Sequence, residues 1–261
     1  MLATCHRFEL ELERDIAEVV ERFDGGVAVL NTRLPLIWSA NYLLLDAGAR
    51  PEPARIERLV DEHLDARGMR HGAVETVAAG NGEPLAAALA ERGWDRDQTL
   101  YKVARRPPDR GPSADAEEIP RDALAPLRRE VAEELERGAG VADQMLERDR
   151  LLDSVAGGRW FAAMHEGVPG SCCVLLSRGG VGQIETVITA PRARNRGLAR
   201  AVLLAALEAS GSAGNDLTFL GADADDWPER LYARLGFDPV GVATAMIRKP
   251  SGYPADDILP A

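Results

Sequence analysis

Apolar and polar residues in the second half of the chain follow two different spacings. Residues 122–137 and Val141–Ala156 carry apolar residues at helical spacing, and the glycines at 138 and 140 separate the two stretches. Pro126 falls in the first turn of the earlier stretch, where proline is tolerated. The pattern therefore predicts two helices with a short break between them.

A series of short apolar stretches follows, separated by residues that favour tight turns. The stretches RWFAAMHE, SCCVLLS and residues 183–189 are separated by GVPG and RGG, which predicts a three-stranded antiparallel meander. The remaining pattern predicts a helix at 198–209, a strand at 217–221, a helix at 227–235 and a strand at 242–248. This order of elements predicts a mixed α/β fold.

A linker rich in proline, glycine and charge, ARRPPDRGPSADAEEIP at 104–120, separates two halves that resemble each other. Residues 89–107 align with residues 232–250, so that Gly-Trp-Asp at 93–95 falls on Gly-Phe-Asp at 236–238. Each copy predicts a helix end, a glycine C-cap and a strand. A repeat at one offset indicates a duplicated unit.

The same offset, slipped by one residue, aligns residues 42–60 with residues 186–204. Both segments predict a short apolar strand, a loop and an amphipathic helix. We therefore predict a first domain at 1–107, a linker at 108–116 and a second domain at 117–261.

The loops of the two halves differ in their chemistry. In the first, Pro51 and Pro53 lack backbone N–H groups and Glu52 adds negative charge. In the second, APRARNRGLARA at 190–201 places arginines and one glycine directly before the predicted helix. A helix N-terminus presents unpaired N–H groups and a partial positive charge, and a residue without a bulky side chain lets a phosphate approach the backbone. The alternative for these residues is a surface loop with solvated arginines.

The composition is that of a globular protein with few cysteines. The formal net charge is −11, which argues against a general nucleic-acid-binding surface, and no apolar run is long enough to span a membrane. Cys5, Cys172 and Cys173 form neither a zinc-binding spacing nor a disulfide framework, so we expect no metal, no membrane association and a reducing, cytoplasmic location. The four histidines have no ligand spacing either.

Residues 113–250 resemble the GNAT N-acetyltransferase superfamily. Arg194-x-x-Gly197-x-Ala199 is similar to the loop with which that family binds the pyrophosphate of acetyl-CoA, with alanine in place of the second glycine, and LYARLGF at 231–237 is similar to a motif near the family's C-terminus. The whole chain resembles the tandem-GNAT arrangement with a degenerate N-terminal half. The resemblance implies two GNAT-like domains, each with a mixed, mostly antiparallel sheet flanked by helices.

The resemblance also implies acetyl-CoA as the cosubstrate and a set of cofactor-binding residues. The strand end would pair with the pantetheine amides, as an added strand does. Asp225 occupies a position where the family often has asparagine, although a solvated helix N-cap is the alternative. The expected cofactor-binding residues are Val187, Ile188, Thr189, Arg194, Asn195, Arg196, Gly197, Leu198, Ala199, Arg200 and Asp225.

Two residues are candidates for the catalytic chemistry. By resemblance, Glu185 takes the proton of the amine, often through water, and Tyr232 lies near the sulfur of the cofactor. There Tyr232 would act as a hydrogen-bond donor, or as an acid only if the site tunes its pKa. The alternatives are a salt-bridged glutamate at a strand edge and an aromatic ring packed between helix and sheet. Strand alternation places residues 183, 185 and 187 on one face and residues 184, 186 and 188 on the other. Trp38, Asn41 and Trp227 are weaker candidates for a substrate cavity.

These features predict an acetyl-CoA-dependent N-acetyltransferase that transfers an acetyl group by direct attack to the amine of a small molecule or peptide. The alternative is a non-catalytic acyl-CoA-binding sensor or scaffold. A nucleotide-binding protein is disfavoured because no Walker lysine follows Gly197. We expect a monomer or homodimer.

Overall fold

The structure, a computed structural model, describes residues 1–76, 82–134, 140–223 and 229–251. The chain divides into two compact units, of which the first comprises Met1–Thr99 with Val242–Ala261 and the second Leu100–Gly241. Both are mixed α/β units with mostly antiparallel strands, so the predicted fold class is confirmed. The predicted linker, residues 108–116, lies within the second unit.

The first unit contains a strand order of β1-β2-β3-β4-β11. The β3–β4 pair is parallel, and the pairs β1–β2, β2–β3 and β4–β11 are antiparallel. Its elements are α1 (Leu2–Ile16), β1 (Val19–Phe23), β2 (Gly26–Leu30), η1 (Trp38–Ala40), β3 (Asn41–Leu45), α2 (Pro53–His63), η2 (Asp65–Arg67), β4 (Gly72–Thr76), α3 (Gly82–Ala90), the start of β5 (Asp95–Ala104) and the end of β11 (Phe237–Arg248).

Strand β2 of the first unit is buried along its whole length because its two faces pack against different groups of residues. Ala28 and Leu30 belong to a core that includes Ile56 and Leu59 of α2, whereas Val27 and Val29 belong to a second core with Trp38. Burial on both faces explains why this strand is apolar throughout instead of alternating.

The second unit contains the strand order β5-β10-β9-β8-β7-β6. The β9–β10 pair is parallel and the pairs β6–β7, β7–β8 and β8–β9 are antiparallel. Its elements are the end of β5, β6 (Glu117–Glu118), η3 (Arg121–Leu124), α4 (Ala125–Glu134), α5 (Val141–Ala156), β7 (Arg159–His165), β8 (Val168–Arg178), β9 (Val181–Thr189), η4 (Pro191–Ala193), α6 (Leu198–Ser212), β10 (Leu217–Asp223), α7 (Glu229–Arg234) and the start of β11.

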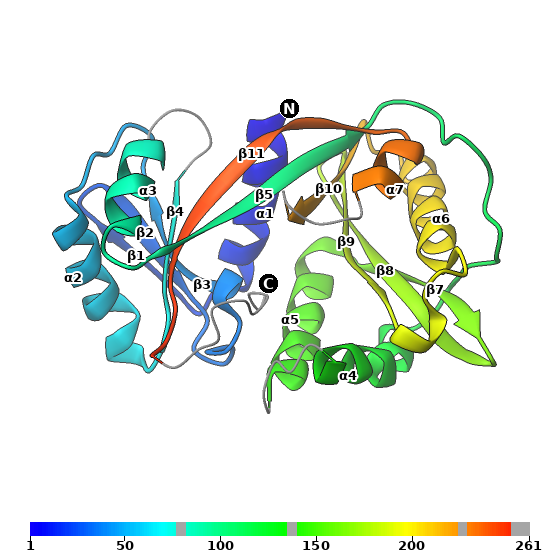
Figure 1. Cartoon of the computed structure of the whole chain (residues 1–261), viewed down its shortest axis with the longest axis horizontal. Helices are drawn as coiled ribbons and strands as arrows, with labels where there is room; N and C mark the ends of the chain where they lie inside the picture. Colours follow the sequence, from blue (N-terminus) through cyan, green and yellow to red (C-terminus); the bar gives the residue numbers. More distant parts are fainter. Residues whose placement is uncertain (77–81, 135–139, 224–228, 252–261) are drawn as a thin grey trace. The chain divides into compact units, whose positions relative to one another are not determined.

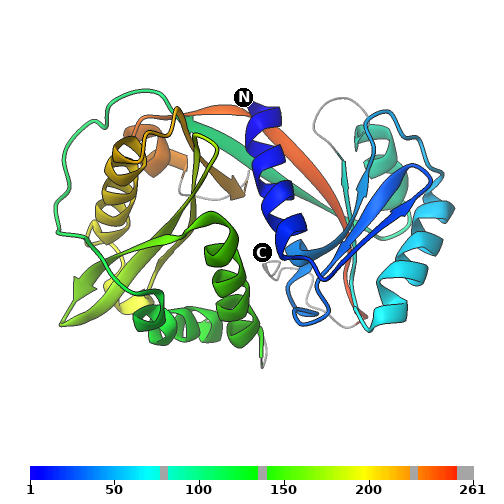
Figure 2. The same cartoon turned by 180° about the vertical axis from the view of Figure 1, so that it is seen from behind.

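Helix α6 lies along one face of the β7–β8–β9 meander, and α4 and α5 lie along the other (Figure 1). The same arrangement is visible from behind (Figure 2). The thiol of Cys173 donates to the Val202 carbonyl oxygen of α6 at 3.3 Å, whereas the neighbouring Cys172 faces the charges of Arg128 and Asp149 on α4 and α5. The two cysteines therefore point to opposite faces, as strand geometry predicts.

The predicted elements of the second half are found with shifted ends. The segment 121–124 is a 3-10 helix, so the α-helical part of the predicted 122–137 helix begins at Ala125, and residues 135–137 lie outside the described residues. Strand β11 begins at Phe237, five residues earlier than predicted. The two aligned glycines, Gly93 and Gly236, have φ values of 84° and 90°, as the predicted glycine C-caps require.

Candidate active site

The loop between β9 and α6 has an irregular backbone. After β9 it forms η4, then Asn195 and Gly197 take positive φ values of 59° and 79°, and Gly197 is the N-cap of α6. A glycine takes a left-handed conformation without the steric cost that a Cβ imposes. Gly197 thus lets the chain turn directly into the helix.

Five consecutive backbone N–H groups follow η4. The N–H of Ala193 donates to the Ala190 carbonyl oxygen at 2.8 Å, and the carbonyl of Gly197 accepts from Ala201 at 3.1 Å. The N–H groups of residues 195–199, which lie between these two donors, Ala193 and Ala201, donate no backbone hydrogen bond within the described part of the chain. A row of free amides at a helix N-terminus is the arrangement that binds an anion.

Three of the four arginines around this loop are bound to acidic side chains. Arg192 pairs with Glu130 at 3.1 Å and Arg194 with Glu134 at 2.5 Å, both glutamates being on α4. Arg200 is 4 % exposed and pairs with Asp109. Arg196 is exposed and has no ion pair among the described residues. The cluster is therefore less positive than its sequence suggests.

Strand β9 contains a bulge before the loop. Glu185 pairs with Val174 and Ile188 with Cys172, so Thr186 and Val187 of β9 stand opposite Cys173 alone. Thr186 has a φ of 55°, a conformation that is strained for a β-branched residue. The predicted alternation across 183–189 is therefore wrong beyond Glu185, because the extra residue reverses the faces.

The parallel pairing of β9 with β10 ends before either strand does. Within the described residues the paired positions run from Val181 with Leu217 to Gln183 with Phe219, although β9 continues to Thr189. In the described part of the chain, the edge of β9 that faces β10 therefore has no strand partner along the predicted pantetheine-binding residues, Val187, Ile188 and Thr189. A strand edge without a partner can pair with an extended ligand.

Glu185 lies one residue before the bulged Thr186 and is ion-paired. Arg148 of α5 donates to its carboxylate at 2.9 Å, and the Glu185 side chain is 26 % exposed. This is the geometry of the salt-bridged alternative, and it leaves part of the carboxylate accessible to solvent.

A buried ion pair next to Arg148 was not predicted from the sequence. Asp149 accepts from Arg128 of α4 at 3.1 Å, and both side chains are buried. Burial raises the pKa of Asp149 to about 6 in spite of the nearby Arg128 and Arg148. The available signal was Asp149 itself, since it lies at helical spacing from the buried Leu152 and Ala156.

Tyr232 is on α7 with 7 % of its surface exposed. Its ring contacts Phe237 edge to face at 6.2 Å between centroids, so it serves as a packing residue whatever its hydroxyl does.

Asp225 and Trp227 lie outside the described residues. Trp38 is buried and stacks on His71 at 5.1 Å, and the buried Asn41 donates to the carbonyl oxygens of Leu34 and Ile37. Trp38 and Asn41 are thus core residues of the first unit.

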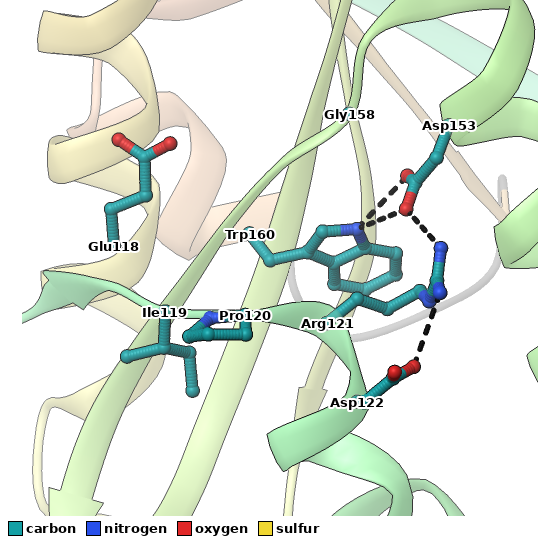
Figure 3. A pocket seen from close by; sticks show the side chains of 8 residues that line it. All are labelled: Glu118, Ile119, Pro120, Arg121, Asp122, Asp153, Gly158 and Trp160. Atoms are coloured by element: carbon teal, nitrogen blue, oxygen red, sulfur yellow. Dashed lines mark hydrogen bonds and ion pairs between the residues drawn. The ribbon is translucent and has the colours of Figure 1, made fainter.

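A polar cavity of about 290 Å³ lies elsewhere in the second unit (Figure 3). Asp153 of α5 accepts from Trp160 Nε1 at 3.0 Å and pairs with Arg121 at 2.5 Å, and Arg121 also pairs with Asp122. The lining contains no residue of the candidate site. Its central polar groups are bound to one another, which gives it no evident ligand.

The described residues contain neither a cluster of metal ligands nor a membrane-spanning helix. Over the described ranges, no group of three or more histidine, cysteine, aspartate or glutamate side chains could hold a metal ion. None of the helices in the described part of the chain is long and apolar enough to cross a membrane.

One protein-family model matches most of the second unit. Residues 127–237 match the family model described as Acetyltransferase (GNAT) family. This range contains β9, the loop and α7. No curated protein matches the sequence.

Solved structures show the same fold over most of the chain. A functionally unknown conserved protein from Staphylococcus epidermidis aligns with a TM-score of 0.68 at 12 % identity, covering 90 % of this chain and 94 % of that one. A GCN5-related N-acetyltransferase from Kribbella flavida gives 0.58 at 19 %, covering 96 % and 97 %. A tandem GNAT protein from the clavulanic acid biosynthesis pathway gives 0.54 at 16 %, covering 82 % and 74 %. Residues 127–237, which contain the unpaired edge of β9 and the row of free amides, are thus the part of the chain that matches the model of the GNAT acetyltransferase family.

Proposed function

We propose that the protein is an acetyl-CoA-dependent N-acetyltransferase whose second half is catalytic and whose first half is a degenerate GNAT-like domain. The observation that carries the proposal is the row of N–H groups at residues 195–199, which have no backbone acceptor among the described residues and lie at the N-terminus of α6. These amides fit the diphosphate of coenzyme A because they are consecutive and supported by a helix N-terminus.

The remaining cofactor-binding residues follow the strand and the loop. The free edge of Val187, Ile188 and Thr189 would pair with the pantetheine amides. Arg196 is the arginine of the loop that is available to a phosphate, whereas Arg194 would have to exchange Glu134 for one. Asp225, predicted with them, lies outside the described residues.

If the protein is an enzyme, acetyl-CoA supplies an activated acetyl thioester and the protein's side chains transfer protons. Glu185 would accept the proton of the attacking amine, directly or through water, from its exposed side. Tyr232 would donate to the departing thiolate. Reference pKa values near 10 for a phenol and 8.5 for a thiol make that transfer uphill by about 2 kcal/mol, so Tyr232 acts best as a hydrogen-bond donor.

The Glu185–Arg148 pair also favours a second candidate function, a non-catalytic acyl-CoA-binding sensor or scaffold. The ion pair with Arg148 gives the Glu185 carboxylate a structural role that requires no proton transfer. This candidate requires the same cofactor site but no turnover.

Two measurements test the proposal and separate the two functions. Calorimetry should detect saturable acetyl-CoA binding that is lost in Gly197→Pro, because proline cannot adopt the φ of 79° at this position. No binding at millimolar acetyl-CoA would refute both functions. Release of free thiol with a panel of small-molecule and peptide amines identifies the enzyme, and Tyr232→Phe should then bind normally and turn over slowly.

The cellular setting and oligomeric state are further parts of the proposal. Cys5, Cys172 and Cys173 are free and buried, as expected for a protein of the reducing cytoplasm. We expect a monomer or homodimer, which sedimentation equilibrium measures directly.

A further inference from the structure

The predicted linker is bound to both motifs of the second half. We call residues 105–113 the linker strap. Its first part follows the turn between α7 and β11: the N–H groups of Arg105 and Arg106 donate to the Gly236 carbonyl oxygen at 3.0 and 3.2 Å. Arg106 also pairs with Asp238 at 2.7 Å. The strap is therefore fixed to the LYARLGF motif.

The second part of the linker strap is fixed to the first turn of α6. The Arg200 guanidinium donates to the carbonyl oxygen of Gly111 at 3.3 Å and also to the Arg110 carbonyl and the Asp109 carboxylate. A buried cation at a helix N-terminus is unfavourable unless acceptors surround it. The strap supplies those acceptors, so Arg200 holds the strap instead of extending toward a phosphate.

This anchoring places Ser113 against Gly197. A Cβ built on Gly197 would collide with the Ser113 hydroxyl oxygen, which lies closer to that position than the Ser113 Cβ does. Ser113 is exposed, and its hydroxyl has no hydrogen-bond partner among the described residues. A free hydroxyl therefore points at the residue around which the free amides are arranged.

We propose that Ser113 is a further ligand of the diphosphate in the site proposed above, and that Arg200 and Asp109 are positioning residues that hold it there. The inference rests on the proposed acetyl-CoA site. A hydroxyl can donate to a phosphate oxygen, and a donor held in place by a buried ion pair loses little conformational freedom on binding. Ser113 lies outside the 127–237 range of the family model, so this chain supplies it from its own linker.

The test is acetyl-CoA binding by calorimetry in Ser113 variants of the full chain. Ser113→Ala should weaken binding about tenfold, the loss of one charge-assisted hydrogen bond. Ser113→Glu should weaken it more than a hundredfold, because its carboxylate would repel the diphosphate and compete for the amides. Ser154 of α5 is an exposed serine whose hydroxyl donates to the Leu151 carbonyl oxygen, and Ser154→Ala and Ser154→Glu are the matched controls.

Three outcomes decide the inference. Wild-type affinity in both Ser113 variants overturns it, and tighter binding in Ser113→Ala overturns it by identifying Ser113 as a blocking residue. Acetyl-CoA lacking the 3′-phosphate should show the same tenfold loss, and disappearance of the loss would overturn the diphosphate assignment. Failure of the wild-type protein to bind acetyl-CoA is a separate result, which removes the proposed function itself.

The positioning role has its own readout. Asp109→Asn should raise the KM for acetyl-CoA several-fold and leave the KM for the amine unchanged, and the effect should vanish in a Ser113→Ala background. Additive effects of the two substitutions would contradict the role of Asp109 in placing Ser113.

Discussion

Two parallel strand pairs of the described residues, β3–β4 in the first unit and β9–β10 in the second, end differently. In the first unit β3 and β4 pair up to the last residue of each strand, Leu45 and Thr76. In the second unit β9 and β10 part after Gln183 and Phe219. Among the described residues, the second pair leaves a strand edge without a partner beside a helix N-terminus, and the first pair does not.

The loops that follow β3 and β9 also differ, and again the backbone of the second unit is the more irregular. Helix α2 begins at Pro53, after Glu52 as its N-cap, whereas α6 begins after Gly197 with free amides on both sides of the cap. Strands β2 and β3 keep a regular register, whereas β9 has a bulge at Thr186. Splay, bulge and an uninterrupted row of N–H groups without backbone acceptors occur together in the second unit. In the equivalent loop of the first unit, Pro51 and Pro53 interrupt such a row, and the β2–β3 and β3–β4 pairs show neither bulge nor splay over their described residues. The comparison teaches that a shared order of elements allows very different backbone geometry in the loops, and the irregular backbone lies where we propose the cofactor site.

The largest expected effect compares a glycine in each loop. Gly48 and Gly197 both have positive φ, 90° and 79°, but nothing lies within 4 Å of a Cβ added at Gly48. Both alanine variants should lose about 1 kcal/mol of stability from backbone strain. Gly197→Ala should also weaken acetyl-CoA binding about a hundredfold, while Gly48→Ala binds normally. Equal binding by the two variants would mean that the loops do not differ in function.

The next effect concerns the carboxylate before the bulge. In an enzyme, Glu185→Gln should lower kcat by about 10² or more and leave acetyl-CoA affinity unchanged, because general base catalysis is lost. Glu75→Gln, a change in a half-buried glutamate of β4 that pairs with His6, is the control from the first unit. Steady-state kinetics measure both. An unchanged kcat in Glu185→Gln would leave Glu185 as a structural ion-pair residue.

A smaller expected effect is a difference between the two units in how their stability depends on pH. Burial lowers the pKa of His71 in the first unit to about 4 and raises the pKa of Asp149 in the second to about 6. The contribution of His71 to stability is present above pH 6.5 and is lost as the pH falls toward 4. That of Asp149 is present below pH 3.8 and is lost as the pH rises toward 6.

Denaturant unfolding between pH 4 and 7 measures these opposite slopes. His71→Asn should remove the decrease in the free energy of unfolding that occurs as the pH falls from 6.5 toward 4. Asp149→Asn should remove the decrease that occurs as the pH rises from 3.8 toward 6. Each decrease is on the order of 1–3 kcal/mol. Slopes of the same sign for the two residues would contradict the assigned protonation states.

The smallest effect compares two arginines of the same loop. Arg196→Gln should weaken acetyl-CoA binding a few-fold, and the loss should shrink as salt is added, because an exposed charge is screened. Arg192→Gln should change binding less, since Arg192 already pairs with Glu130. Calorimetry at two salt concentrations tests this. A larger loss from Arg192 than from Arg196 would reverse the assignment.

Much of this fold could be predicted because local signals agreed with each other. The turn residues of the meander, Gly93 and Gly236 at helix ends, and Gly197 before α6 each marked a real element boundary. The bulge could not be predicted, because Thr186 is β-branched and gives no sign of a left-handed backbone. Nor could the partners of the arginines, since Glu130, Glu134 and Asp109 are each 60 or more residues away in the sequence. The positive charge of the loop is visible in its sequence, whereas the acidic side chains that neutralise it are identified only by the tertiary contacts.

Amide hydrogen exchange with and without saturating acetyl-CoA tests the central claim most directly, because it monitors the loop amides themselves. The account predicts strong protection of residues 195–199 on binding and no change at the corresponding loop and helix start of the first unit, residues 50–55. Binding of acetyl-CoA that leaves residues 195–199 unprotected would contradict it.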